Sequence, residues 1–442
     1  MRRPPGPGAI GAARIAAARG NRPARLAEIA REYGDVVYVR VGPSGFYLLS
    51  HPELAHGVLV AHDDRFQRVP GERRYSRWVL GESLFASEGE LHARQRALID
   101  PILYGRAPDQ HAKEMVEFAS GMTSEWRQGE TIDVLAHHEE MTTAIMVKVL
   151  FGEDGPRGRA LARALLDAIE ASDAIPLAPT RIPRRVPLPS KRRFRRALAQ
   201  LHRLIDEAAA ASGASTDPSV DVLSQLRAAR GPDGRGMSDA QARDEAIGLY
   251  RGQKRVAAAG LSWTWHLLGT HPEAERRFHE EVDALGGRPL TYADARRLPY
   301  TLMVFREALR IHPPSWILAR KSIAPHPVGT YEIPAGATVL VSPWVHHRDA
   351  RFWKEPEAFR PERFADGVPQ LPLGAYFPQG AGPKRCPGLD LLPVEAVMVL
   401  ATIGQRWRLR PQPGHTVVPW ATAFLAPRGG LPMVLERRAG LS

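Results

Sequence analysis

The sequence contains a single cysteine, Cys386, among 442 residues. It therefore cannot form an internal disulfide, and no zinc or iron–sulfur site of the CxxC type can be built from this chain alone. It also has no apolar run of the ~18 residues that a membrane-spanning helix requires, and prolines and glycines interrupt its basic N-terminus. We therefore expect a cytoplasmic protein in a reducing compartment, without a membrane partner.

The excess of positive charge is moderate, because 60 Lys and Arg against 48 Asp and Glu give a net charge of +12. No finger, RNP-like or basic-zipper pattern accompanies this charge. Most arginines stand among Glu and Asp at helical spacing, which predicts a mixed, solvated surface. A nucleic-acid partner is therefore disfavoured, and the composition is that of an ordinary globular chain with a large core.

Helical periodicity dominates the chain, and no repeat or long linker divides it. This pattern predicts a mainly α fold with small β-sheets, organised as one large domain over residues 1–442 with a flexible segment at residues 1–20. The expected elements are a helix closed by Gly34, a hairpin over residues 35–50, helices over residues 90–211 broken at the prolines of residues 176–189, a long helix over residues 239–268 behind a capping box at Ser238 and Gln241, and a closing hairpin at Gly429 and Gly430.

Residues 181–196 hold eight basic side chains, and an apolar stripe runs from Phe194 to Ala208 at helical spacing. The stripe predicts a helix with one buried face and a solvated basic back. The alternative is a mobile basic flap over a substrate entrance.

The segment YFPQGAGPKRCPGLDLL, residues 376–392, is the most informative part of the sequence. Gly380 and Gly382 precede Cys386, and Gly388 follows it. Glycine permits positive φ and close backbone approach, so this loop can curl around one sulfur atom. Backbone N–H groups and the N-terminus of the next apolar helix would then stabilise a thiolate.

A thiolate held in this way is either a nucleophile or a metal ligand. A nucleophile requires a base, and no histidine flanks Cys386, although a distant one among the sixteen could serve. An inert core cysteine has no need of a glycine-rich cationic loop. A thiolate ligand to haem iron fits best, because it also accounts for Lys384 and Arg385 as cations that could meet haem propionates.

The chain resembles a cytochrome P-450. The likeness rests on the cysteine loop together with further motifs and extends from PPGPGAI near the start to PRGGLPMVLE near the end. The resemblance implies haem b with Cys386 as the axial iron ligand. EALR and FRPERF match the ExxR and PERF motifs of that family, which implies a buried ion-pair cluster of Glu307, Arg310 and Arg363. The further haem-binding residues implied are His92 and Arg96 of HARQR, Arg320 of ARKS, and Lys384 and Gly380 of the cysteine loop.

Two residues depart from the usual cysteine region of this family. Gln379 stands seven residues before the cysteine, where the family usually has Phe, so aromatic packing against the loop is lost or replaced. That change could alter the electronics at sulfur. Pro393 is also unusual; it is either tolerated in the first turn of the following helix or kinks that helix.

The long helix departs more sharply. Residues 252–257 align with the family's AG-x-(Glu/Asp)-Thr-(Thr/Ser), in which the acid and the alcohol relay protons during oxygen activation. Here Arg255 replaces the acid and Val256 the alcohol. Valine cannot hydrogen-bond, and arginine does not release its proton. By the resemblance, Gly252, Arg255 and Val256 form the wall of the distal pocket nearest the iron.

Three functional interpretations follow. In the first, the chain is a monooxygenase of secondary metabolism that oxidises a hydrophobic small molecule, receives electrons from a ferredoxin and its reductase, and has another proton source. In the second, it is a peroxide-driven peroxygenase in which Arg255 anchors a substrate carboxylate; PQGAG resembles the PQGGG of fatty-acid peroxygenases. In the third, it is a haem isomerase, a coupling enzyme or an inert haem sensor.

Overall fold

The computed structural model describes residues 3–8, 11, 15, 17–41, 44–103, 107–173, 189–213, 216–217 and 221–438. The chain forms two compact units. The first, here called the sheet unit, contains Met1–Val69, Ala119–His138 and Arg255–Ser442. The second, the helical unit, contains Pro70–Phe118 and Glu139–Lys254. Helices dominate the described residues and the sheets are small, which confirms the predicted fold class.

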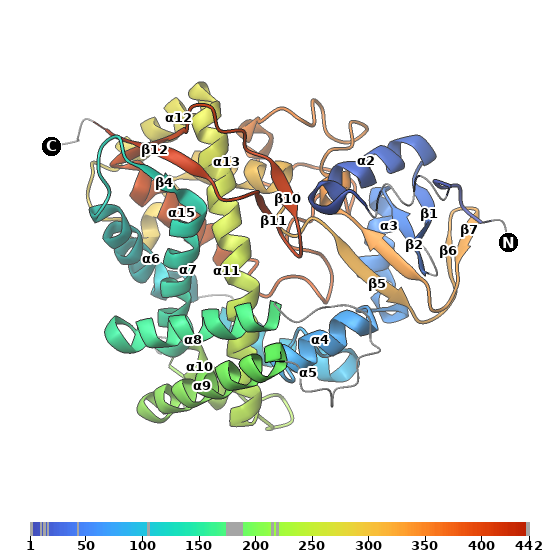
Figure 1. Ribbon diagram of the computed structural model, residues 1–442, viewed down its shortest axis with the longest axis horizontal. Helices are drawn as coiled ribbons and strands as arrows, with labels where there is room; N and C mark the ends of the chain where they lie inside the picture. The colour runs from blue at the N-terminus through green and yellow to red at the C-terminus, as the bar shows by residue number, and fades with distance from the viewer. Residues whose placement is uncertain are drawn as a thin grey trace. The chain divides into compact units, whose positions relative to one another are not determined.

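The main sheet of the sheet unit joins early and late parts of the chain (Figure 1). Its strand order is β1 (Val36–Val41), β2 (Ser44–Leu49), β8 (Thr338–Val341), β5 (Leu318–Ser322) and β3 (Phe66–Gln67). β1 and β2 are antiparallel, with Val36 opposite Leu49, which confirms the predicted hairpin. Successive residues of a strand point to opposite faces of the sheet. Val36 of β1 therefore packs in the apolar cluster that contains Leu49, and Val37 packs in the cluster that contains Leu48.

The helices of the sheet unit begin and end where the sequence signals lie. α2 (Arg22–Tyr33) ends at Gly34, as predicted, with a positive φ of 95° that glycine adopts readily; its ψ of −160° lies outside the left-handed helical region. α3 (Pro52–His56), α12 (Pro272–Asp283), α13 (Pro299–Ile311) and α14 (Pro343–His346) each have a proline in the first turn. α15 (Leu391–Gly404) is almost wholly buried, and Pro393 lies in its first turn, where a missing N–H costs nothing.

The predicted closing hairpin at Gly429 and Gly430 is wrong. Both glycines have positive φ, 76° and 96°, and they turn the chain. In the described residues, however, the strand before the turn, β11 (Leu425–Pro427), pairs with β10 (Pro419–Ala421). The strand after it, β12 (Pro432–Arg437), pairs with β9 (Trp407–Pro411) and β4 (Thr131–Asp133). The glycines therefore connect two sheets; β6 (His326–Val328) and β7 (Tyr331–Ile333) form a further small sheet.

The helical unit contains α4 (Pro70–Leu80), α5 (Gly89–Leu103), α8 (Gly155–Asp173), α9 (Pro189–Ser212) and α10 (Val222–Ala228). Three longer helices contribute to both units: α6 (Ala107–Ser124), α7 (Val134–Phe151) and α11 (Asp239–Thr270). The predicted stripe on α9 is confirmed, because Phe194, Leu201, Ile205 and Ala208 are buried. Of the proline-rich stretch, residues 176–188 lie outside the described residues.

α11 is the long helix that the sequence predicts. The N–H of Gln241 donates to the Ser238 hydroxyl at 3.1 Å, which is one half of the expected capping box. Tyr250, Trp263 and Trp265 are almost fully buried, so the helix is covered on more than one side. In the part of the chain that the structure describes, no helix combines the length and apolar surface needed to cross a membrane.

Candidate functional site

Backbone hydrogen bonds hold the cysteine loop in the sheet unit. The N–H of Cys386 donates to the C=O of Gln379 at 2.9 Å, and the N–H of Gly380 donates to the C=O of Phe377 at 3.0 Å. The loop therefore doubles back between Gln379 and Cys386. Cys386 is a partly buried residue.

The glycines of this loop are required by its geometry. Gly380 has φ of 78° and Gly382 has φ of 71°, a region that other residues rarely adopt. A Cβ atom on Gly382 would also overlap the carbonyl oxygen of Leu59. The loop thus lies against the chain near Leu59 with no room for a side chain, and both glycines serve backbone shape.

Lys384 makes a nearly buried ion pair within the sheet unit. Its ammonium group donates to the two carboxylate oxygens of Asp63 at 2.8 and 2.6 Å, and to the C=O of Phe66 at 3.4 Å. The side chain of Lys384 is 6% exposed and that of Asp63 is 15% exposed. An ammonium group has three protons to donate, so a propionate contact at Lys384 would have to share them with Asp63.

Arg320 lies in β5, which passes beside the cysteine loop. It is buried, and its backbone is paired with Val339 of β8. A Cβ atom on Gly380 would contact the Leu318 side chain of the same strand at 3.9 Å. The structure therefore brings the strand of Arg320 together with the loop of Gly380, Lys384 and Cys386.

The predicted ion-pair cluster is present, and its Glu307–Arg310 pair is inaccessible to solvent. Arg310 directs Nε and Nη2 to the two carboxylate oxygens of Glu307, at 2.7 and 2.8 Å, and neither side chain is exposed. Arg363 adds Nε at 3.2 Å from the same carboxylate. The remaining nitrogen of the Arg310 guanidinium, Nη1, donates to the C=O of Pro356 at 2.6 Å. Such paired, planar contacts make a rigid network.

His347 joins this cluster to the cysteine loop, and no sequence motif points to it. Its Nε2 accepts from the N–H of Phe377 at 3.0 Å, and its Nδ1 donates to the C=O of Arg310 at 3.3 Å. Burial lowers the pKa of His347 well below its usual range, which keeps the ring neutral and able to accept. In the sequence, His346-His347 looks like any pair of core histidines.

The remaining predicted haem ligands lie in the helical unit. His92 and Arg96 are four residues apart on α5, so they share one helix face, and both are buried. Arg96 pairs with Asp100 at 3.0 Å. In α11, Gly252 lies against Phe85, since a Cβ atom there would be 3.0 Å from the Phe85 ring. The structure thus groups the predicted residues by unit.

The charged stretch of α11 is largely accounted for inside the helical unit. Arg251 donates to the Ser172 hydroxyl at 3.1 Å and to the Tyr75 hydroxyl at 3.4 Å. Lys254 forms an ion pair with Glu139 at 3.6 Å. These contacts offset the cost of burying charge in the middle of a helix. Arg255 is partly exposed and Val256 is buried. They are the first two residues of the part of α11 that belongs to the sheet unit.

Glu245 is a buried acid of α11 that the sequence reasoning missed. Its carboxyl oxygen Oε2 accepts from the backbone N–H of Leu84 at 2.8 Å. Burial raises the pKa of Glu245 to about 8, despite that hydrogen bond. Its neighbour Asp244 accepts from the N–H of Glu82 at 3.0 Å. The sequence signal was an Asp-Glu pair at the start of an otherwise apolar stretch.

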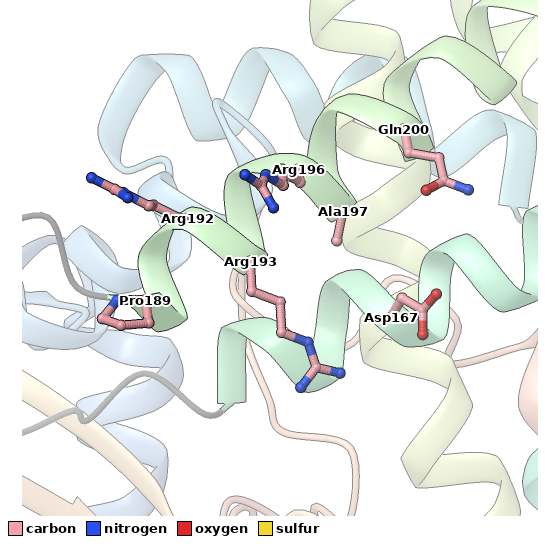
Figure 2. Close-up of a pocket in the computed structure, with 7 residues that line it drawn as sticks. All are labelled: Asp167, Pro189, Arg192, Arg193, Arg196, Ala197 and Gln200. Atoms are coloured by element: carbon pink, nitrogen blue, oxygen red, sulfur yellow. The ribbon is translucent and has the colours of Figure 1, made fainter.

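A polar cavity of about 490 Å³ lies on α8 and α9 of the helical unit. Figure 2 shows the arginines on α9 and Asp167 on α8. It is lined by Asp167, Pro189, Arg192, Arg193, Arg196, Ala197 and Gln200. None of the predicted haem or distal residues lines it, and its cationic walls do not suit a hydrophobic substrate. The flap interpretation of this region stays a prediction, because residues 174–188 lie outside the described part.

The fold, the glycine-shaped cysteine loop and the Glu307 cluster match what the sequence leads us to expect of a haem-thiolate enzyme. Comparison with known families agrees: the model of the family "Cytochrome P450" matches residues 4–430. The chain belongs to the cytochrome P450 family. Members of this family carry haem, and relatives of this chain are named as monooxygenases.

Several characterised relatives come from Streptomyces. Cyclooctatin synthase of Streptomyces melanosporofaciens is 34% identical over 439 residues, covering 98% of this chain and 95% of that protein. Cyclooctat-9-en-7-ol 5-monooxygenase of the same organism is also 34% identical, covering 94% of this chain and 91% of that protein. Pentalenene oxygenase of Streptomyces avermitilis is 28% identical, covering 91% and 90%.

Solved structures share the fold. A six-coordinated cytochrome P450 from Thermus thermophilus superimposes with a TM-score of 0.72 at 28% identity, covering 94% of this chain and 98% of that one. A retinoic acid-bound cyanobacterial protein gives a TM-score of 0.81 at 22% identity, covering 92% and 93%. The second likeness concerns the fold alone.

The described residues fit a haem group. Cys386 is a partly buried residue in a loop that glycines shape. The side-chain amide nitrogen of Gln379, in the same loop, is buried and has no hydrogen-bond partner among the described residues. A buried donor without an acceptor is costly, so the loop is suited to a group bound against it.

Proposed function

We propose that this chain is a haem b-dependent monooxygenase of secondary metabolism that oxidises a hydrophobic cyclic molecule. The observation that carries the proposal is the loop in which the C=O of Gln379 accepts from the N–H of Cys386 and in which Gly380 and Gly382 have positive φ. Cys386 would ligate the iron, and Arg320, Lys384, His92 and Arg96 would hold the propionates. The bound haem supplies oxygen activation, driven by electron transfer.

The names of the relatives narrow the substrate class. One relative acts on cyclooctat-9-en-7-ol, a cyclic unsaturated alcohol, and another is named for pentalenene, an alkene. We propose a cyclic unsaturated hydrocarbon or its alcohol as the substrate. Such a molecule binds by burial of apolar surface, with few polar contacts to set its orientation.

The sequence of α11 bears on proton supply. Val256 has no hydroxyl group, and Arg255 cannot act as a proton donor at neutral pH. Protons must then come from water or from a substrate hydroxyl group, and an alcohol substrate offers one. We further propose a ferredoxin and a ferredoxin reductase as the electron source, and a cytoplasmic location consistent with a single, reduced cysteine.

Thiolate ligation is the first thing to test. The wild-type protein, reduced and exposed to carbon monoxide, should give the absorption band of a thiolate-bound haem, and Cys386→Ser should lose it. Turnover of a cyclic alkenol should then require dioxygen, a reduced ferredoxin and the reductase together. A variant that keeps the thiolate spectrum without Cys386 would refute the ligand assignment.

A peroxygenase is the second candidate, and Arg255 is the observation in its favour. It is a partly exposed cation where the family usually has an acid. If it anchors a carboxylate, acidic compounds should shift the ferric spin state and neutral ones should not, and Arg255→Ala should abolish the shift. Lys254→Ala is the matched control, because Glu139 already pairs with that neighbouring cation.

The same titration separates the three interpretations. Equal responses to neutral and acidic compounds, unchanged in Arg255→Ala, would leave the monooxygenase. A selective response to acids, with turnover by hydrogen peroxide alone, would establish the peroxygenase. Ligand binding without oxidation of the ligand, either with dioxygen and reduced ferredoxin or with hydrogen peroxide, would identify an isomerase, a coupling enzyme or an inert sensor.

A further inference from the structure

We propose that the cavity on α8 and α9 binds the diphosphate group of a small organic molecule through Arg192, Arg193 and Arg196. The cavity belongs to the helical unit alone. The proposal goes beyond the proposed function, because none of the residues assigned to the haem or to the oxidised substrate takes part. It gives a role to the basic stretch of α9, which the haem chemistry leaves unused.

The first observation is that packing fixes the orientation of α9. Phe194 is 1% exposed, and the centroid of its ring lies 4.7 Å from that of Trp78 on α4. Leu201 and Ile205, further along the same stripe, are fully buried. A helix with one apolar stripe buried is held at a single rotation about its axis. The arginines that flank Phe194 therefore keep fixed places on the surface of α9.

The second observation is that three arginines gather at one cavity. Arg196 follows Arg192 by four residues and Arg193 by three, and residues at these spacings are neighbours on a helix surface. All three line the cavity of about 490 Å³. Small-molecule pockets commonly have volumes of about 300–1,000 Å³. Figure 2 shows Arg193 extending from α9 toward α8, where Asp167 lines the same cavity. The space is therefore large enough for a small organic anion.

The third observation is the charge of the lining. Arg192, Arg193 and Arg196 are exposed, and none of them has a hydrogen bond or an ion pair with another described residue. Like charges at helical neighbour spacing repel each other. Asp167 is the only acid in the lining, so three arginines and one aspartate leave a net charge of +2. An anion with more than one negative charge would cancel this excess.

The chemistry of the side chains indicates which anion fits. Each guanidinium presents a planar fork of N–H donors that matches a phosphate group in a bidentate way. A diphosphate has two phosphoryl groups and can accept from more than one fork, whereas a single carboxylate occupies only one. The rest of the lining is Pro189, Ala197 and Gln200, which offers apolar contacts and one amide to an organic group. A nucleoside diphosphate and an alkyl diphosphate share this chemistry.

The test is calorimetric titration of the haem-loaded full chain at about 0.15 M salt, where charges further apart than about 8 Å are screened. We expect saturable binding of ADP or of farnesyl diphosphate, with one ligand per chain. AMP should bind at least about tenfold more weakly, because it engages fewer guanidinium forks. Tighter binding of ADP identifies a nucleotide, and tighter binding of farnesyl diphosphate identifies an alkyl diphosphate. Equal affinity for citrate would overturn the assignment to diphosphates.

Variants locate the bound anion. Arg193→Ala and Arg196→Ala should each weaken diphosphate binding by about tenfold or more. Arg195→Ala is the matched control, because Arg195 is an exposed arginine of the same helix that is not among the lining residues. Asp167→Asn should tighten binding, since it removes the negative charge from the cavity. Glu170→Gln, at an exposed position three residues further along α8, should not.

The outcomes separate a built site from a diffuse cationic surface. Equal losses in Arg195→Ala and Arg196→Ala, or equal gains in Asp167→Asn and Glu170→Gln, would overturn the proposal. So would the lack of saturable binding of both diphosphates at concentrations up to about 1 mM. The replaced side chains are exposed, so the variants should fold like the wild type, and an unchanged Soret band verifies this. Failure of the proposed function would leave these titrations unchanged.

Discussion

Lys384 donates to both carboxylate oxygens of Asp63, a residue 321 positions earlier in the chain, and both side chains are largely buried. The pair fixes the cysteine loop to the segment before β3. By the family resemblance Lys384 faces a propionate, whereas the structure gives its ammonium a carboxylate of the protein itself.

The first prediction concerns this pair. Asp63→Asn should lower the free energy of unfolding by about 3 kcal/mol, because it leaves a nearly buried ammonium without its counter-charge. Urea denaturation followed by circular dichroism measures the change. Asp366→Asn, at an exposed position, is the control and should shift the midpoint little. Equal stability of Asp63→Asn and wild type would contradict a structural ion pair.

The second prediction concerns the fork between Arg310 and Glu307. Arg310→Lys keeps the charge but presents one ammonium group in place of a planar guanidinium, so it loses contacts to Glu307 and Pro356 together. We expect a loss of about 3–5 kcal/mol in unfolding free energy, together with poor haem retention.

The control for Arg310→Lys is Arg276→Lys. Arg276 also contacts a glutamate three residues away, Glu273, but that pair is exposed to solvent. Its replacement should change stability by less than about 0.5 kcal/mol. Similar losses in the two variants would show that burial of the Arg310 fork contributes nothing.

The third prediction is a pH dependence caused by Glu245. The usual pKa of a glutamate is near 4.5, and burial raises that of Glu245 to about 8. Between these values the unfolded chain releases the proton while the folded chain keeps it, so stability falls as the pH rises. Glu245→Gln should flatten this slope, whereas the exposed control Glu170→Gln should retain it. Denaturant midpoints from pH 4.5 to 8 provide the measurement.

The fourth prediction separates the cost of positive φ from the cost of steric overlap when a glycine is replaced. Gly382→Ala must adopt positive φ and also overlap the Leu59 carbonyl, whereas Gly414→Ala must adopt positive φ in open space. The Gly414 variant should lose about 1 kcal/mol. The Gly382 variant should lose more and should bind less haem, measured by the Soret-to-protein absorbance ratio. Equal losses would mean that the contact with Leu59 yields easily.

Features that depend on neighbouring residues were predictable from the sequence. The positive φ at Gly34 and Gly380 and the start of α11 near Ser238 follow from local rules of backbone geometry. The cysteine loop was predictable for the same reason. The Glu307 cluster became visible through the resemblance, because two short motifs implied one buried carboxylate.

Features that depend on distant partners were not predictable. Nothing in the sequence pairs Lys384 with Asp63, or Arg251 with Ser172, since each pair is created by the fold. The closing hairpin failed for this reason as well. Gly429 and Gly430 indicate a turn, and the chain does turn there. The strand after the turn pairs with β9 and β4, which are distant in the sequence and so are not part of a local pattern.

His347 has a consequence for assembly. One neutral imidazole serves a carbonyl at the end of α13 and an N–H at the start of the cysteine loop. We therefore expect the shape of the loop to depend on the packing of the helix that carries Arg310 and the segment that carries His347. If Cys386 ligates haem iron as proposed, we expect haem affinity to depend on a fully packed core around His347.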